Sequence, residues 1–458
     1  MKSAFSPILG LLALDVAAIT ASPVTVNISS KLQEVDGFGF SQAFVRAAEF
    51  QAADSVLQKK ALDLLFSKDQ GAGFSIIRNW IPSSSNFTIL PESPGSPSTT
   101  PTYRWDRWDE GQLWFTKQAA SYGVEKVYAD AWSAPGFMKT SGREALPGYL
   151  CGTPGHDCES GDWRQAYANY LVQYVKFYQQ EGLDVTHLGF LNEPDFKPDY
   201  SQMQISPNAS EAISFIPILR QTIDDARLNL SITCCDATGW KKQSGFTDAL
   251  VAADMQKDLG IITSHTYSSD ATYPLNTSLH VWVTEAGVPR SAGGFVPTWY
   301  NTGALNEGLT WASKIATAFV DANLNAYLYW EGFEINAQES ASHLIDTLGD
   351  EVLPSGVFYA FSMWSRFIRP GAHRVATTGS VPNVVTAAFE NTDRSVIIVF
   401  TNSGSSSQSA QLLVPGRSSA HAWLTDNSHK VARTSVKGSG SSIEVIIPAH
   451  SVVTVKFD

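Results

Sequence analysis

The sequence predicts an α/β fold in which a (β/α)8 barrel carries a side β-sandwich near its C-terminus. From residue 35 to residue 365, short apolar runs alternate with longer helical stretches. From residue 366 on, the pattern changes to short strand-like runs divided by Ser- and Gly-rich turns. An alternating run near the N-terminus, Val24–Ile28, is expected to pair with that second sheet. An open, doubly wound sheet is the alternative for the first region.

The apolar runs of the first region are nearly continuous, as expected for parallel strands that are covered on both faces. The expected strands are Asp36–Ser41, Phe74–Ile81, Lys126–Trp132, Val185–Asn192, Ser231–Ala237, Ile261–Tyr267, Val281–Glu285 and Ala326–Trp330. Among the intervening stretches, Arg164–Gln180 has the clearest helical spacing of apolar and aromatic residues. Eight such repeats over this length are typical of a (β/α)8 barrel.

The second region is expected to form a small β-sandwich. Its strands are expected at Val384–Phe389, Ser395–Asn402, Gln408–Val414, Ala420–Leu424, Ile443–Ile447 and Val452–Phe457. The predicted organisation is a signal peptide at residues 1–22, an N-terminal strand of the sandwich at 23–34, the catalytic barrel at 35–365 and the side sandwich at 366–458. A Ser-, Pro- and Thr-rich stretch, residues 83–101, follows the second barrel strand and is expected to be a long loop on the functional face.

Composition narrows the class of function. The chain has 458 residues, 43% of them apolar, and a formal net charge of −12. A protein of this composition is globular rather than disordered. A nucleic-acid partner is not expected, because there is no dense run of Lys or Arg to neutralise phosphates. Low charge, many hydroxyl residues and 13 Trp favour a neutral, hydroxyl-rich partner.

The N-terminus is typical of a secretory signal. Lys2 supplies a positive charge, Ile8–Ile19 is mostly apolar, and the small residues Ala21 and Ser22 mark the expected cleavage region. The apolar stretch is too short to span a bilayer, so no membrane association is expected. A buried N-terminal helix is the alternative. We therefore expect a secreted, extracellular protein.

Further features fit secretion. N-glycosylation sequons occur at Asn27, Asn86, Asn208, Asn229 and Asn276. Cys151 and Cys158 flank a short Gly- and Pro-containing loop and are expected to form a disulfide. The adjacent Cys234 and Cys235 are either buried thiols or a vicinal bridge. No metal-binding motif is present, and neither a metal nor a cofactor is expected.

Two carboxylates stand where apolar strands end. Asn192-Glu193-Pro194 ends the fourth expected strand, and Thr284-Glu285 ends the seventh. Reactive residues of a barrel gather at the C-terminal ends of its strands, and strands four and seven face each other across the mouth. Two opposed carboxylates suit glycoside hydrolysis, with retention at a separation of about 5–5.5 Å and inversion at about 6.5–9.5 Å. The alternative is two solvated strand-end residues.

These motifs resemble a known family. Asp36-Gly37-Phe38-Gly39, Trp132-Ser133-Ala134-Pro135, Asn192-Glu193-Pro194 and Thr284-Glu285 are similar to motifs of the retaining glycosidases of clan A, and more closely of glycoside hydrolase family 30. The segment Gln42-Ala43-Phe44-Val45-Arg46-Ala47 and the sandwich narrow the resemblance to the fungal xylanases of subfamily seven. The resemblance covers essentially the whole mature chain.

The resemblance implies roles for individual residues. Glu193 would be the general acid/base and Glu285 the nucleophile. Asn192 would bind the 2-hydroxyl of the sugar under attack. Arg78, at the end of the second strand, would keep the nucleophile ionised, or else form a structural ion pair. Tyr267 would orient Glu285 or contact substrate, with a core tyrosine as the alternative.

Aromatic rings are expected to line the sugar-binding cleft, because the C–H faces of sugars stack on them. Trp80, Trp132 and Trp330 stand at or near strand ends and are the candidates, with core packing as the alternative for each. Glu331 and Glu334 follow the eighth strand and are competing carboxylates of lower rank.

Arg46 follows the first strand. In similar fungal glucuronoxylanases an arginine here binds the carboxylate of a glucuronic acid branch, which a guanidinium can grip with two hydrogen bonds. A scaffold salt bridge is the alternative.

The resulting expectation is a secreted, monomeric, retaining hydrolase of the β-1,4-linked backbone of glucuronoxylan or xylan, with endo or exo action left open. An endo-β-1,6-glucanase or β-1,6-galactanase of the same family is the first alternative. A carbohydrate-binding protein without turnover is the second.

Overall fold

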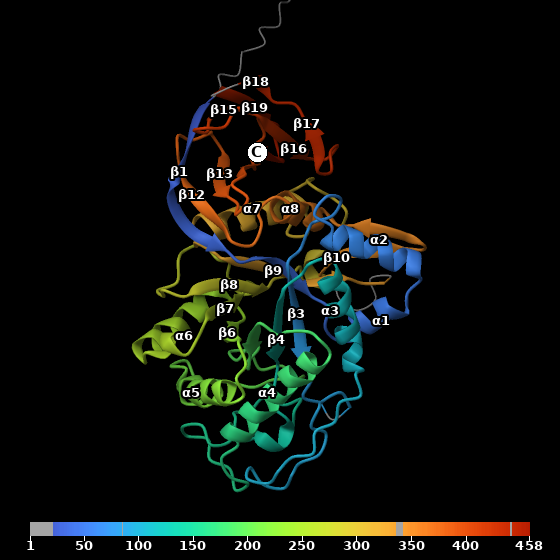
Figure 1. The fold of residues 1–458 in the computed structure, drawn as a ribbon, viewed down its shortest axis with the longest axis vertical. Coiled ribbons are helices and arrows are strands. Elements are labelled where there is room, and N and C mark those ends of the chain that lie inside the picture. The colour runs from blue at the N-terminus through green and yellow to red at the C-terminus, as the bar shows by residue number, and fades with distance from the viewer. Residues whose placement is uncertain (1–21, 85, 336–341, 440–441) are drawn as a thin grey trace, which may run out of the picture.

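The computed structural model describes residues 22–458 with the exception of 85, 336–341 and 440–441. The predicted signal peptide lies outside the described residues, apart from Ser22, where strand β1 begins. Figure 1 shows a barrel of strands and helices beneath a second, mostly β unit that contains the C-terminus.

The barrel confirms the predicted (β/α)8 fold. Its parallel strands follow the chain order β2 to β9, and β9 pairs with β8 to close the ring. They are β2 (Gly37–Ser41), β3 (Ile76–Ile81), β4 (Lys126–Ala131), β5 (His187–Gly189), β6 (Ser231–Ala237), β7 (Ile261–His265), β8 (His280–Glu285) and β9 (Ala326–Phe333). Each coincides with one of the expected runs. The ring is filled by buried side chains, among them Ile76, Tyr128, Trp282 and Leu328, as in other barrels of this class.

Two strands extend this sheet beyond the ring. β10 (His343–Leu348) pairs in parallel with β9, and β11 (Glu351–Pro354) folds back on β10. Neither strand was expected from the sequence. Both come after the eighth repeat and lack the long apolar run that marks the barrel strands.

Helices cover the outside of the ring. They are α1 (Arg46–Ala52), α2 (Ser55–Phe66), α3 (Gln112–Ser121), α4 (Arg164–Gln180), α5 (Ser210–Asp225), α6 (Trp240–Ala252), α7 (Gly308–Val320) and α8 (Gly356–Ser365). The bounds of α4 are those predicted, and the tyrosines at the expected spacing form its buried face. Some helix starts are set by capping: Asp54 accepts hydrogen bonds from the backbone N–H groups of Val56 and Leu57 at the start of α2.

The sandwich unit has its own sheet and apolar core. Its strands are β1 (Ser22–Val35), β12 (Ala372–Thr378), β13 (Val384–Glu390), β14 (Val396–Asn402), β15 (Gln408–Leu413), β16 (Ala420–Thr425), β17 (Ala432–Thr434), β18 (Lys437–Ser439), β19 (Ser442–Ile447) and β20 (Ser451–Phe457). As expected, the N-terminal strand belongs to it. β1 lies between β12 and β15, antiparallel to the first and parallel to the second.

The two units are packed together through helices α7 and α8, which lie between the barrel and the sandwich in Figure 1. α7 contacts β13, β14 and β20, while α8 contacts β16 and β20. Arg366 and Arg369, just after α8, donate to backbone carbonyls of Gln70, Gly71 and Gly73 in the loop after α2. The sandwich is therefore fixed on the helical shell of the barrel.

The cysteines form two disulfides. Cys151 is joined to Cys158 with a Cα–Cα distance of 5.5 Å, and Cys234 is joined to its neighbour Cys235. The vicinal bridge is thus the outcome for the pair that the sequence left open. Among the described residues, no helix has the length and apolar character needed to cross a membrane.

Candidate active site

A cleft of about 920 Å³ opens at the C-terminal ends of the barrel strands. It is lined by Phe44, Trp80, Ser84, Trp132, Glu144, Ala145, Asn192, Glu193, Phe196, Asp199, Tyr200, Ser201, Thr238, Tyr267, Ser268, Glu285 and Trp330. Seven of the residues singled out from the sequence are in this set, namely Trp80, Trp132, Asn192, Glu193, Tyr267, Glu285 and Trp330. The strand-end rule for barrels thus locates most of the site.

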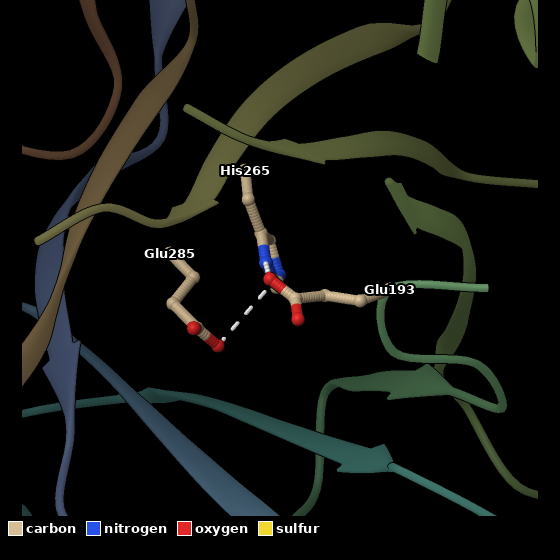
Figure 2. A group of neighbouring side chains, drawn as sticks. All are labelled: Glu193, His265 and Glu285. Atoms are coloured by element: carbon tan, nitrogen blue, oxygen red, sulfur yellow. Dashed lines mark hydrogen bonds and ion pairs between the residues drawn. The ribbon is translucent and has the colours of Figure 1, made fainter. Parts of the chain in front are cut away.

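Glu193 and Glu285 approach each other over the cleft. Glu285 is the last residue of β8, and Glu193 follows β5 in a left-handed backbone conformation with φ 48°. A carboxylate oxygen of each lies within 4.8 Å of the other. Figure 2 shows the two carboxyl groups reaching inward from different sides, with the ring of His265 against them. This separation is close to that of retaining glycosidases, about 5–5.5 Å.

Arg78 anchors the carboxylate of Glu285. Its side chain is fully buried below the cleft, and Nη1 donates to Oε2 of Glu285. Nη2 donates to Asn192 Oδ1 at 2.6 Å and to Asp130 Oδ2 at 2.9 Å. Burial lowers the pKa of the guanidinium, but the charges of Glu285, Asp130 and Asp236 outweigh it and raise that pKa above its usual range. A fixed cation therefore faces Glu285.

Two further predicted residues complete this arrangement. Because Oδ1 of Asn192 accepts from Arg78, its amide N–H groups remain as donors toward the cleft that Asn192 lines. The hydroxyl of Tyr267 donates to Oε1 of Glu285 at 2.8 Å. Glu285 is thus held by one donor at each oxygen.

His265, the last residue of β7, was not predicted to belong to the site. Its Nδ1 lies 3.0 Å from Oε1 of Glu193, and its Nε2 lies 3.4 Å from Asp236 Oδ1 and 3.7 Å from Glu285 Oε2. Burial lowers the pKa of this imidazole, but the carboxylates outweigh burial and raise it to about 10. His265 is therefore an imidazolium in the neutral range, placed between both catalytic candidates.

Asp130 and Asp236 form the floor beneath these residues. Asp236 accepts from the hydroxyls of Tyr128 at 2.7 Å and Thr263 at 2.5 Å. Burial raises the pKa of Asp236, but hydrogen bonding to His265 and the charge of Arg78 lower it overall. Gly189 in β5 makes room for the carboxylate of Asp130, since a Cβ at position 189 would lie 2.0 Å from Asp130 Oδ1.

The two candidate carboxylates differ in their surroundings. Burial raises the pKa of Glu193, with a further contribution from the charge of Glu285, while His265 acts in the opposite direction. Glu285 instead accepts hydrogen bonds from Arg78 and Tyr267. Two carboxyl groups in such different surroundings suit the separate roles of general acid and nucleophile.

Four aromatic rings form one wall of the cleft: Phe44, Trp80, Trp132 and Trp330. The ring of Phe44 contacts the other three, at centroid distances of 4.6 to 5.9 Å. Trp132 also lies 4.3 Å from the guanidinium of Arg78. This aromatic wall therefore adjoins the Glu285 side of the cleft.

Arg46 lies apart from the residues that line the cleft. It is 5% exposed, and its Nη1 donates to Oε2 of Glu49 at 2.7 Å. Its Nε lies 3.7 Å from Oε1 of Glu331 and 3.8 Å from Oε1 of Glu334. The two competing carboxylates of the sequence are thus partners of this arginine and not part of the cleft. Such an ion-pair network matches the scaffold alternative for Arg46.

A metal ion fits the site poorly. Glu193, His265 and Glu285 offer three ligand atoms within 4.8 Å of one another. However, a ligating histidine must be neutral, whereas the pKa of His265 is raised to about 10. Arg78 already supplies a positive charge to Glu285. The cationic side chains of Arg78 and His265 therefore already lie beside the carboxylates that a metal ion would need as ligands.

The sequon asparagines Asn27, Asn86, Asn208, Asn229 and Asn276 are all solvent-exposed. They lie on different elements of the barrel and the sandwich, so each is sterically accessible for a glycan.

Comparison with protein families gives two matches. Residues 98–257 match the model described as "O-Glycosyl hydrolase family 30", and residues 371–455 match "Glycosyl hydrolase family 30 beta sandwich domain".

Comparison with individual proteins extends over nearly the whole chain. The catalytic domain of GH30 xylanase C from Talaromyces cellulolyticus has a similar structure, with 44% sequence identity, a TM-score of 0.91, and coverage of 95% of this chain and 100% of that one. Glucuronoxylanase XynC from Bacillus subtilis strain 168 is 24% identical over 95% of this chain and 92% of its own length. Endo-1,6-beta-D-glucanase BGN16.3 from Trichoderma harzianum is 21% identical over 76% of this chain and 72% of its own length.

Proposed function

This chain belongs to glycoside hydrolase family 30, and we propose from that premise that it is a secreted retaining xylanase. It cleaves the β-1,4-linked xylose backbone of xylan or glucuronoxylan. The xylan specificity is supported by the 44% identity, over 95% of this chain, to a fungal xylanase.

In the first chemical step, Glu285 attacks the anomeric carbon and Glu193 donates its proton to the departing glycosidic oxygen. The C–O bond to the leaving sugar breaks, and the sugar becomes an ester of Glu285. Arg78 and Tyr267 orient the attacking carboxylate, since both donate hydrogen bonds to its oxygens. The N–H groups of Asn192 face the position of the sugar 2-hydroxyl, where a hydrogen bond strengthens in the transition state.

In the second step Glu193, now a carboxylate, removes a proton from water, and the water oxygen attacks the same carbon. The ester bond to Glu285 breaks, and Glu193 regains its proton. Two inversions give net retention. The observation that supports this mechanism is that one carboxylate oxygen of Glu193 lies within 4.8 Å of one of Glu285. That proximity is nearer the separation of about 5–5.5 Å found in retaining enzymes than the about 6.5–9.5 Å of inverting ones.

The experiment is the hydrolysis of xylan by the wild type and by E285Q and E193Q. We expect E285Q to lose activity by a factor on the order of 10⁴ or more, as for loss of a nucleophile. A 2-deoxy-2-fluoro xyloside with a good leaving group should add one sugar mass to the peptide that contains Glu285 in the wild type. Full activity of both variants would refute the catalytic pair, and a wild type inert on every glycan would favour a binding protein.

The choice of sugar is tested by comparing β-1,4-xylan, glucuronoxylan and β-1,6-glucan. The β-1,6-glucanase alternative is retained because of the similarity to the Trichoderma glucanase. Among the described residues, Arg46 lies against the carboxylates of Glu49, Glu331 and Glu334. The described residues that line the cleft include no Lys, Arg or His. We therefore expect unbranched xylan to be cleaved at least as fast as glucuronoxylan. Strong dependence on the acidic branch, lost in R46A, would instead support the predicted role of Arg46.

Secretion is supported by the N-terminal signal pattern, two disulfides and exposed sequons. N-terminal sequencing of the protein from the culture medium should begin near residue 22, and glycopeptide masses should identify the occupied sites. The proposed functional unit is a single chain, and light scattering should give a monomer mass.

A further inference from the structure

Two further aromatic side chains that line the cleft have no role in the chemistry described above. Phe196 and Tyr200 lie in the loop between β5 and α5, line the cleft, and are 46% and 45% exposed. Burying a side chain of this size contributes about 1.5–3 kcal/mol. Two rings left open at the same cleft therefore offer a ready surface for an apolar partner.

The loop holds Phe196 in a defined position. The backbone carbonyl of Phe196 accepts hydrogen bonds from Nε2 of Gln202 at 3.0 Å and of Gln204 at 3.1 Å. Its N–H donates to the carbonyl of Glu193 at 2.9 Å. Gln202 and Gln204 are 0% and 4% exposed. The buried side-chain amides of Gln202 and Gln204 therefore fix the backbone at Phe196, while the ring of Phe196 stays exposed.

The preceding residue is fixed as well. The carboxylate of Asp195 accepts from the backbone N–H of Thr238 at 2.9 Å and from its hydroxyl at 2.6 Å. Thr238 follows β6, so the loop is tied to the neighbouring barrel strand. The exposure of Phe196 is therefore imposed by the fold and prepared before any ligand binds.

The position of this loop assigns it to one side of the reaction. Glu193 gives its proton to the leaving oxygen, so the leaving sugar lies on the Glu193 side. The loop is joined to Glu193 by its backbone, because the Glu193 carbonyl accepts from the N–H of Phe196 and from Nε2 of Gln202. Burial raises the pKa of the Tyr200 hydroxyl, and the nearby charges of Glu193 and Glu285 raise it further. The wall of Phe44, Trp80, Trp132 and Trp330 adjoins Arg78 and Glu285 instead.

We propose that Phe196 and Tyr200 form the platform that binds the sugar on the leaving-group side of the cleaved bond. This inference rests on the proposed hydrolase function. The apolar C–H face of that sugar stacks on the ring of Phe196, while Tyr200 covers its edge near Glu193. The substrate is then a chain that continues past the cleaved bond in both directions.

The same platform serves an acceptor sugar in the second step. A sugar hydroxyl held there attacks the anomeric carbon in place of water, and its proton passes to the Glu193 carboxylate. The new C–O bond forms as the ester bond to Glu285 breaks, so atoms and charges balance. Transfer to sugars should therefore compete with hydrolysis at high substrate concentration.

The test separates substrates that need the platform from those that do not. Xylohexaose places a sugar on the leaving side, whereas an aryl β-xylobioside carries only a phenol there. For F196A we expect kcat/KM on xylohexaose to fall by a factor on the order of 10, equivalent to about 1.4 kcal/mol. Its activity on the aryl xylobioside should stay within about twofold of the wild type. The fraction of transfer products should also fall, and F196W should restore both properties.

Y273A is the matched control, because Tyr273 is 40% exposed and is not part of the cleft lining. It should leave both substrates unaffected. Equal losses of F196A on both substrates, or no loss on either, would overturn the platform. A wild type that cleaves neither substrate would overturn the proposed function instead.

Discussion

His265 brings one imidazole into contact with three carboxylates. It approaches Glu193, Asp236 and Glu285 through its two ring nitrogens. Each contact favours the imidazolium, which explains why the pKa is raised to about 10 despite complete burial. The positive charge in turn opposes the effect of burial on Glu193. The His265 imidazolium thus interacts with both the proposed general acid and the proposed nucleophile.

Replacing His265 should change the pH profile of the enzyme. With Glu193 as the proposed general acid, activity should fall as pH rises and Glu193 loses its proton, so the alkaline limb of kcat/KM should follow its pKa in the free enzyme. His265 lowers that pKa. H265Q should therefore move the alkaline limb to higher pH and reduce kcat/KM by a factor on the order of 10, measured on an aryl xylobioside.

The control for this variant is H421Q, because His421 is 47% exposed and lies on the sandwich strand β16. It should keep the wild-type profile. An alkaline limb of H265Q that stays in place while activity falls would indicate a purely structural role for His265.

The sequence could identify the site only in part. Glu193 and Glu285 stand at the ends of apolar runs, where a barrel gathers its functional groups. Asp130, Asp236 and His265 lie inside or at the end of such runs, and a charged residue within a buried strand is itself a signal that could have revealed them. Partners such as Arg46 with Glu331 depend on the arrangement in space, which spacing along the chain does not reveal.

At the scale of elements, Asp109 connects two helices of the barrel shell. It lies just before α3, and its carboxylate accepts hydrogen bonds from the hydroxyls of Tyr174 and Tyr178 on α4. Burial raises the pKa of Asp109 to about 7, against the hydrogen bonds from these tyrosines. The folded state therefore holds a proton here that the unfolded chain releases at lower pH.

This group should make stability depend on pH between about 4 and about 7. The folded pKa lies above the unfolded value of 3.8, so the stabilising contribution is complete below the unfolded pKa and is lost as pH rises through about 7. The amide introduced by D109N cannot ionise, so the variant should lose less stability than the wild type over this interval. The difference in the free energy of unfolding should be a few kcal/mol, since one pKa unit corresponds to about 1.4 kcal/mol.

Urea unfolding of both proteins at the two ends of this interval measures the difference. D184N is the control, because Asp184 is exposed in the loop between α4 and β5. Equal loss of stability in the wild type and D109N would show that Asp109 is ionised in the folded protein.

Elements with a strong repeating pattern were the most predictable. The barrel strands and α4 have long apolar or amphipathic runs, so the sequence alone locates them. Strands β12, β17 and β18 were missed, as were β10 and β11. Three of these five strands have only three or four residues, which is too short for a periodic signal. Their pairing is decided by neighbouring strands and not by their own sequence.

At the scale of the whole molecule, the sandwich contains strands from both ends of the chain. β1 lies inside the sheet, between β12 and β15. Val24 and Val26 are fully buried in the sandwich core. A C-terminal fragment without β1 would expose two strand edges and an opened core. The sandwich is therefore a structural unit but not a continuous segment.

Residues 366–458 expressed alone should therefore lack cooperative thermal unfolding. Addition of a synthetic peptide of residues 22–35 should restore β-sheet circular dichroism and a cooperative transition, because it supplies the missing strand. A scrambled peptide of the same composition is the control. A fragment that folds cooperatively without the peptide would show that β1 is dispensable for the sandwich.

The place of β1 also has a consequence for biosynthesis. Thr25 pairs with Thr378, and Ser22 pairs with Ala410. The first strand to leave the ribosome must therefore wait, unpaired, until almost all of the polypeptide has been translated. Pairings over such a distance are slow to form, and an exposed strand edge invites aggregation in the meantime. The charged and polar residues near the end of β1, Lys31, Gln33 and Glu34, would help to keep the nascent chain from self-association during that time.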